Sequence, residues 1–254
     1  YAQPVRDTAW TKAGYFGLKL TQVSLSSWSA GGESALAFDS QITYSADFKR
    51  DRQLWQNRLE LGYGLTKNDG KSARKTNDKI YFASTYGYQI YKTLYWSALL
   101  NFNTQFAKGY DYNIEDSDFI SKFMAPGYLM IGTGVTWSPN KIFTATFTPA
   151  SWRGTIVADS RLSDEGAFGV DKGKHLLSEF GANLKAEVNY EFLPNMKVYS
   201  RLELYSNYLE DPQNVDVRWE VQLNMAINKW FSTTLSTNLL YDNDVKIAQK
   251  DGTA

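Results

Sequence analysis

The chain has 254 residues, carries 27 acidic and 27 basic side chains, and has a mean hydropathy of −0.43. These values fit a soluble domain, and no apolar run approaches the roughly 18 residues that a membrane-spanning helix needs. The absence of cysteine excludes a disulfide framework and a thiolate metal site.

Two-residue periodicity recurs along the chain and predicts an all-β protein. In the first strand Phe16, Leu18 and Leu20 alternate with polar residues, and an extended chain places alternate side chains on opposite faces. Eleven strands are expected, at about 14–24, 35–48, 54–66, 79–91, 94–106, 123–137 and 141–150, in a hairpin over 178–204, and at 215–227 and 231–241. Pro126 and Pro149 each remove a hydrogen-bond donor, so each predicts a bulge or a strand end.

The hairpin over 178–204 shows the pattern most clearly, with apolar residues on one face and charged residues on the other. Folding about residue 194 pairs opposite charges across the strands, namely Lys185 with Glu203 and Glu187 with Arg201. The same register pairs Leu184 with Leu204 and Ala186 with Leu202 on the other face. Both faces therefore predict one register.

The length of these strands indicates a membrane. About 13 residues at roughly 3.3 Å each, tilted by about 40°, give an apolar band near the thickness of a bilayer core. The sequence predicts a transmembrane antiparallel up-and-down β-barrel, one domain over 1–254, with apolar side chains toward lipid and charged ones toward the lumen.

Bacterial single-chain barrels have an even number of strands, so about 12 are expected here. The twelfth is expected to be absent from the printed sequence, with closure by a partner protein as the alternative. The alternative fold is a secreted β-sandwich, which would share a dry core between two sheets. Its core would contain Leu184, Val188, Leu202, Val221 and Leu235.

Short and long connections alternate along the chain. Short turns are expected near 49–53, 91–93, 138–140, 193–196 and 228–230, and longer polar connections near 25–34, 67–78, 107–120, 151–177 and 209–214. This alternation is typical of outer-membrane barrels of Gram-negative bacteria, and it predicts a periplasmic N-terminus. An interfacial aromatic girdle is expected at the short-turn end. It comprises Phe48, Trp55, Tyr88, Trp96, Trp137, Tyr190, Phe192, Trp230 and Phe231.

Several segments resemble one family. They are 10–34 (WTKAGYFGLKLTQVSLSSWSAGGES), 59–65 (LELGYGL), 74–88 (RKTNDKIYFASTYGY), 99–112 (LLNFNTQFAKGYDY), 164–170 (DEGAFGV) and 206–230 (SNYLEDPQNVDVRWEVQLNMAINKW). They are similar to a family of outer-membrane β-barrel proteins of Bacteroidota that is known only as a domain of unknown function. The resemblance implies location and architecture, and it brings no activity, catalytic residue or ligand with it.

Charged residues are expected in the lumen, where two rows extend the hairpin to the next strand. The rows are Glu187, Arg201 and Glu220, and Lys185, Glu203 and Arg218. Neither sign dominates, so the lumen does not resemble the ring of a selective ion pore. Long paired side chains favour a narrow or closed lumen.

No catalytic residue is expected. His175 is the only histidine, and in a strand its separation of three residues from Ser178 would place the two on opposite faces. A weak candidate for metal binding is the loop that contains Asp111, Asn113, Glu115 and Asp118, although an acidic run in a solvated loop is common. The chain is predicted not to be an enzyme and to hold no cofactor.

The segment 67–79 mixes both signs of charge without aromatic residues between them, which argues against nucleic-acid binding. A solvated loop, or one that meets lipopolysaccharide phosphate, is expected. The function expected first is a structural or accessory subunit of a larger outer-membrane assembly. A porin-like passive channel for small polar or amphipathic solutes is the alternative, and a surface glycan binder or lipid-acting enzyme is a weaker one. Expected partners are outer-membrane lipid, lipopolysaccharide and other outer-membrane proteins.

Overall fold

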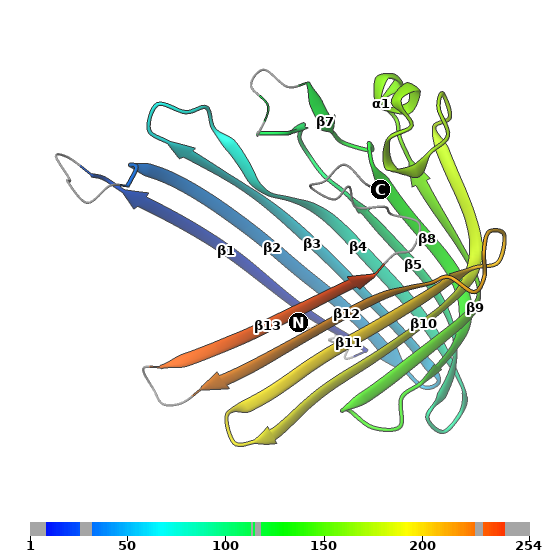
Figure 1. Ribbon diagram of the computed structural model, residues 1–254. Helices are drawn as coiled ribbons and strands as arrows, with labels where there is room; N and C mark the ends of the chain where they lie inside the picture. Colours follow the sequence, from blue (N-terminus) through cyan, green and yellow to red (C-terminus); the bar gives the residue numbers. More distant parts are fainter. Residues whose placement is uncertain (1–8, 26–31, 113, 115–117, 227–230, 242–254) are drawn as a thin grey trace, which may run out of the picture. The chain divides into compact units, whose positions relative to one another are not determined.

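The computed structural model describes residues 9–25, 32–112, 114, 118–226 and 231–241, and nearly all of its regular structure is antiparallel β (Figure 1). One sheet contains eleven strands in the order β1-β2-β3-β4-β5-β8-β9-β10-β11-β12-β13, and β6 and β7 form a separate pair. The strands are β1 (Trp10–Val23), β2 (Ala35–Arg50), β3 (Gln53–Asn68), β4 (Arg74–Tyr91), β5 (Leu94–Thr104), β6 (Gly109–Tyr110), β7 (Phe119–Ser121), β8 (Gly127–Trp137), β9 (Phe143–Ile156), β10 (Leu176–Leu193), β11 (Met196–Asn207), β12 (Val215–Ala226) and β13 (Ser232–Tyr241). A short helix α1 (Ser160–Glu165) and a 3-10 turn η1 (Ala167–Gly169) follow β9. No helix in the described ranges is long and apolar enough to cross a bilayer.

The chain divides into two compact units. The first contains Tyr1–Tyr86, Leu99–Met130 and Gly154–Ser178, and the second contains Gly87–Ala98, Ile131–Arg153 and Glu179–Ala254. The charged strands β10 to β12 lie in the second unit, apart from the first residues of β10, and helix α1 lies in the first.

All eleven expected strands are present, and several are longer than their apolar pattern predicted. β4 begins at Arg74, so the expected polar connection 67–78 is reduced to residues 69–73. The prediction of a solvated loop over 67–79 is therefore wrong for the residues from Arg74 onward. Backbone hydrogen bonds propagate a strand whatever the polarity of its side chains, so hydropathy alone underestimates strand length.

The two prolines have different outcomes. β8 begins directly after Pro126, as expected for a strand end, whereas β9 continues through Pro149 to Ile156. The expected strand end near residue 150 is wrong, whereas the other outcome expected at Pro149, a bulge, fits the burial along the strand. The buried hydroxyl side chains stand at even positions before the proline, Thr146 and Thr148, and at odd positions after it, Ser151 and Thr155, while Gly154 is buried as well. A one-residue change of phase is what a β-bulge produces.

The hairpin has the predicted register. Its two-residue turn is Pro194–Asn195, and Asn195 has a φ of 69°, a left-handed conformation that asparagine tolerates. The paired residues are Leu184 with Leu204, Lys185 with Glu203, Ala186 with Leu202 and Glu187 with Arg201. The β11–β12 register pairs Arg201 with Glu220 and Glu203 with Arg218, as the two predicted charge rows require. Both predictions are confirmed.

Burial is inverted relative to a water-soluble sheet. On β10 Phe180 is 41% exposed, whereas its neighbour Glu179 is 7% exposed. Among the described residues, nine buried polar or charged residues stand against six buried apolar ones. Leu184 and Leu235, which a β-sandwich would bury, are both exposed. Large exposed apolar side chains along the sheet include Phe16, Leu18, Leu20, Leu36, Ile42, Tyr44, Trp55, Phe147, Phe180, Trp219, Leu235 and Leu239.

Two glycines permit close approach of neighbouring strands in the second unit. A Cβ at Gly181 would lie 2.0 Å from the carbonyl oxygen of Ser206, and a Cβ at Gly134 would lie 2.0 Å from that of Phe147. No side chain can occupy either position without moving the backbone. Small hydroxyl residues near the second contact are almost fully buried, namely Ser97, Thr146, Thr148 and Ser151. The sheet is therefore tightly packed on its polar face at these points.

We expect Gly181→Ala to destabilise the protein by about 1 to 3 kcal/mol, because overpacking must displace backbone atoms. Gly14→Ala is the matched control, since a Cβ there meets only ordinary contacts, the nearest at 3.6 Å. Urea unfolding of both variants in detergent measures the difference. Equal stability of the two variants would contradict the close approach at Gly181.

Candidate functional site

The polar face of β10, β11 and β12 carries charges in a checkerboard. The three strands form two rows, Lys185, Glu203 and Arg218 in one and Glu187, Arg201 and Glu220 in the other. Each charged residue is paired with a residue of opposite charge on the neighbouring strand. The six residues contain three positive and three negative groups. We call these six residues the charge ladder. It has no net charge of its own.

The contacts within the charge ladder are mostly long. Arg201 Nε lies 3.2 Å from Glu187 Oε1, and Arg201 Nη1 lies 3.9 Å from Glu220 Oε2. Arg218 Nη1 lies 3.9 Å from Glu203 Oε2. The fourth contact differs from the predicted row, since Lys185 Nζ lies 3.5 Å from Glu187 Oε2 on its own strand.

These pairs are also partly open to solvent. The side chain of Glu187 is 28% exposed and that of Arg218 is 69% exposed. Exposed ion pairs contribute between about 0 and 1 kcal/mol each, because water screens the charges and ordering long side chains costs entropy. The charge ladder therefore contributes little to the stability of the fold. Its pairing favours one strand register and leaves this face without net charge.

A tighter group of charges lies on the same face, beyond the charge ladder toward the long connections. Arg153 on β9 donates from Nε and Nη2 to both carboxylate oxygens of Glu179 on β10, at 2.7 and 2.5 Å. Its Nη1 donates to Asp216 Oδ2 on β12 at 3.0 Å. The guanidinium also stacks on Tyr205 of β11, 3.9 Å from the ring centroid. We call Arg153, Glu179, Tyr205 and Asp216 the Arg153 cluster.

Three members of the Arg153 cluster are more buried than the charge ladder, whereas the Arg153 side chain, 29% exposed, is about as open as Glu187. The Glu179 side chain is 9% exposed and that of Asp216 is 19% exposed, while Tyr205 as a whole residue is 6% exposed. The bidentate contact to Glu179 matches the fork of a guanidinium to the two carboxylate oxygens, which is the strongest geometry for such a pair. Asn183, opposite Tyr205 in the register, is also buried.

Sequence reasoning missed Arg153 because it ended the strand near residue 150. By alternation Glu179 falls on the same face as Lys185 and Glu187, and Asp216 on the same face as Arg218 and Glu220. The phase change beside Pro149 is what turns Arg153 toward them. The available signal was Pro149, a proline within a strand pattern. Interpreting it as a bulge in a strand that continues would have placed Arg153 on the charged face.

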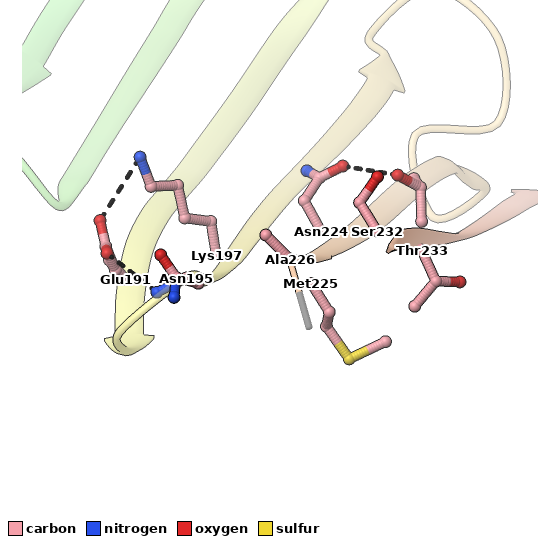
Figure 2. Close-up of a pocket in the computed structure, with 9 residues that line it drawn as sticks. Glu191, Asn195, Lys197, Asn224, Met225, Ala226, Ser232 and Thr233 are labelled. Atoms are coloured by element: carbon pink, nitrogen blue, oxygen red, sulfur yellow. Dashed lines mark hydrogen bonds and ion pairs between the residues drawn. The ribbon is translucent and has the colours of Figure 1, made fainter. Parts of the chain in front are cut away.

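A shallow pocket of about 380 Å³ lies on the polar face at the opposite, short-turn end of these strands (Figure 2). It is lined by Glu191, Asn195, Lys197, Asn224, Met225, Ala226, Ser232, Thr233 and Thr234. Two contacts frame it, Lys197 to Glu191 at 3.4 Å and Thr234 to Asn224 at 2.9 Å. Amide and hydroxyl groups share the lining with the apolar surface of Met225 and Ala226.

The predicted aromatic girdle is only partly described. Trp230 lies outside the described residues, and most of the others are exposed: Trp55, Tyr88, Trp96, Trp137, Tyr190, Phe192 and Phe231. Phe48 is half-buried, and its ring centroid lies 5.2 Å from that of Trp10, which in turn lies 5.8 Å from that of Trp55. The interfacial role of these residues stays a prediction.

His175 and the acidic loop form no chemical centre. His175 Nδ1 lies 2.7 Å from the carbonyl oxygen of Val157, and its own carbonyl oxygen accepts from the Val157 N–H. The histidine therefore fastens two segments of backbone together. Asn113 and Glu115 lie outside the described residues, so the metal prediction stays untested there. Elsewhere in the described chain no group of three or more potential His, Cys, Asp or Glu ligands is found.

The long connections in the first unit have a small apolar core of their own. Ala125, Val157, Leu162 and Val170 are between 0 and 2% exposed and pack with Phe119, Ala167, Phe168 and Leu177. Helix α1 begins after Asp159, whose Oδ1 accepts the Leu162 N–H at 3.1 Å. The hydrogen bond from the Lys122 ammonium, together with the one from Leu162, holds the pKa of Asp159 below its ordinary value. The sequence did not predict this core.

Two family models match separate parts of the chain. Residues 20–110 match a family described as "Protein of unknown function (DUF3078)", and residues 151–253 match one described as "Protein of unknown function, DUF481". Each match covers less than half of the chain. A search of curated proteins gave no match. The matches agree with the expected likeness to a domain of unknown function, and they assign no activity.

We expect Asp159→Ala to weaken helix α1 by about 1 kcal/mol, the usual cost of losing an N-cap side chain. Because the pKa of Asp159 is lowered in the fold, its contribution is present above its unfolded pKa of about 3.9 and is lost as pH falls through the lower, folded value. Hydrogen exchange of the α1 amides, corrected for intrinsic rates, measures both effects. Asp164→Ala, at an exposed helix position, should leave exchange unchanged, and equal effects of the two variants would contradict the cap.

Proposed function

We propose that the chain is an integral outer-membrane β-barrel of a Gram-negative bacterium of the Bacteroidota, with a periplasmic N-terminus. Its apolar face meets lipid, and its charged face lines a narrow or closed lumen. The protein acts as a structural or accessory subunit of a larger outer-membrane assembly.

The inverted burial carries this proposal. Leu20 is 68% exposed and Leu235 is 62% exposed, whereas Glu179 is buried. In water this arrangement costs free energy, because apolar surface is hydrated and a charge is not. In a bilayer the same arrangement is favourable, because apolar side chains meet hydrocarbon and charged ones meet each other in an enclosed polar interior. The exposed apolar residues alternate with polar ones along the strands, as a lipid-facing surface requires.

The neutral charge ladder supports a structural role over selective conduction. A selective pore needs a ring of one sign, whereas the charge ladder contains three charges of each sign. His175 is the only histidine in the sequence, and its Nδ1 contacts the carbonyl oxygen of Val157, which gives no support to a role as the base of a hydrolase. The chain is therefore proposed not to be an enzyme.

A passive channel for small polar or amphipathic solutes is the second candidate. The observation that favours it is the pocket of about 380 Å³ at the short-turn end of β10 to β13, which offers both polar and apolar surface. A lumen with such an opening at one end would conduct if nothing blocked its other end.

Native purification tests the proposal. We expect extraction from membranes only with detergent, because the exposed apolar face needs lipid or detergent around it. Native mass spectrometry of the extract should then show the protein with companion outer-membrane proteins. Extraction by salt or carbonate alone would exclude the barrel.

Planar-bilayer recordings of the same preparation separate the two roles. A structural subunit with a closed lumen should give no sustained open currents. Sustained currents from protein that purifies without companion proteins would contradict the structural role and favour the channel.

A further inference from the structure

A row of aromatic side chains crosses three strands at the short-turn end of the first unit. The register places Trp10 of β1 opposite Phe48 of β2, and Phe48 opposite Trp55 of β3. The ring centroid of Trp10 lies 5.2 Å from that of Phe48 and 5.8 Å from that of Trp55. By alternation these residues share the apolar face with the exposed Phe16 and Leu18 of β1. We call Trp10, Phe48 and Trp55 the aromatic row.

The neutral polar groups beside the aromatic row have partners within the protein. Trp55 Nε1 donates to Ser84 Oγ at 2.9 Å, and Ser84 Oγ donates to Asn57 Oδ1 at 2.8 Å. Asn57 Nδ2 in turn donates to the carbonyl oxygen of Ala46 at 3.1 Å. A polar group that faces hydrocarbon needs such partners, because lipid chains offer none. This chain of hydrogen bonds therefore suits a lipid-facing surface.

Two cationic residues flank the aromatic row on the same face. Lys12 follows Trp10 by two residues on β1, and Arg50 follows Phe48 by two residues on β2. Because β1 and β2 are antiparallel, the two cations lie on opposite sides of the row. The Lys12 ammonium lies 5.9 Å from the Trp10 ring centroid, so this side chain bends back toward the row. Long cationic side chains on a lipid-facing surface extend to headgroup level in this way, because a charge in hydrocarbon is costly.

These cations are available to an external anion. The turn Asp51–Arg52 between β2 and β3 adds one charge of each sign, so Lys12, Arg50 and Arg52 stand against one carboxylate, and all four residues are exposed. None of the ion pairs between described residues includes Lys12, Arg50 or Arg52. The surface beside the aromatic row is therefore positively charged, and it complements a negatively charged headgroup.

We propose that Lys12, Arg50 and the aromatic row bind an anionic phospholipid of the leaflet at the short-turn end. This inference rests on the proposed barrel and names one lipid that its apolar face selects. Lys12 and Arg50 stand four positions apart in the register, about 13 Å along the strands, and two long side chains can close on one phosphate across that distance. The acyl chains then lie along the row and the exposed Ile42 and Tyr44. A headgroup with net negative charge binds better than a zwitterionic one, whose own cation is repelled.

Lipid retention by the full chain in detergent tests the site. Native mass spectrometry of protein from micelles with equal amounts of phosphatidylglycerol and phosphatidylcholine reports which lipid stays bound. We expect the wild type to retain phosphatidylglycerol several-fold over phosphatidylcholine, and Lys12→Gln with Arg50→Gln to lose this preference. Circular dichroism checks that the double variant folds. Equal retention of the two lipids by the wild type, or an unchanged preference in the folded double variant, would overturn the proposal.

A matched variant separates this site from a general attraction to cations. Lys92→Gln with Lys141→Gln removes two exposed cations from other short turns and should keep the preference of the wild type. An equal loss of preference in this variant would contradict a site at the aromatic row. Lipopolysaccharide serves as a competitor from the opposite leaflet. If it displaced phosphatidylglycerol from the wild type more effectively than added phosphatidylglycerol does, the proposed occupant would be wrong.

Salt gives a second readout of the same contacts. The preference for phosphatidylglycerol should decline between about 0.1 M and 1 M salt, since the screening length falls from about 10 Å to about 3 Å. A preference that salt leaves unchanged would contradict the role of the cations. Protein that needs detergent but shows no lipid preference would refute the lipid site while the barrel stands. Release from membranes by carbonate alone would refute the barrel itself.

Discussion

The alternation of side chains along an extended chain is the constraint on which this structure depends. Each strand has two faces, and here the apolar face is exposed while the polar face carries the buried charges, as Phe180 and Glu179 show side by side. Such a sheet has no apolar core of its own, and the described apolar core belongs to the long connections. Its cohesion must come from the backbone ladder, from polar contacts and from whatever medium covers the apolar side.

The sequence predicted the strands and the hairpin register well because two independent patterns agreed. Lys185 and Glu187 face Glu203 and Arg201 only in the register that also pairs the apolar residues, so a slip by one residue would disrupt both faces at once. The register of β12 against β11 followed from the same reasoning. Ion pairing within a row was less predictable, and Lys185 turned to Glu187 along its own strand, because long side chains choose among several near partners.

What the sequence could not predict lies where alternation breaks or ends. The change of phase beside Pro149 reversed the face of Arg153, and the sequence pattern could not decide between the two outcomes that this proline predicts, a bulge or a strand end. The close approaches at Gly134 and Gly181 depend on neighbouring strands and cannot be seen in one strand alone. The loop core joins segments far apart in the chain, around Ala125 and Leu162, that have no shared period.

Burial along the polar face follows the number of hydrogen bonds that each charge can make. Removing a charge from water costs several kcal/mol unless partners replace its hydration. Arg153 has three hydrogen bonds and a stacked ring, and its side chain is 29% exposed. Arg218 has a single carboxylate at 3.9 Å and remains 69% exposed. A charge can leave water only where neighbouring groups replace its hydration, and among the charges on this face Glu179, which accepts two hydrogen bonds from Arg153 and is 9% exposed, comes nearest to that condition.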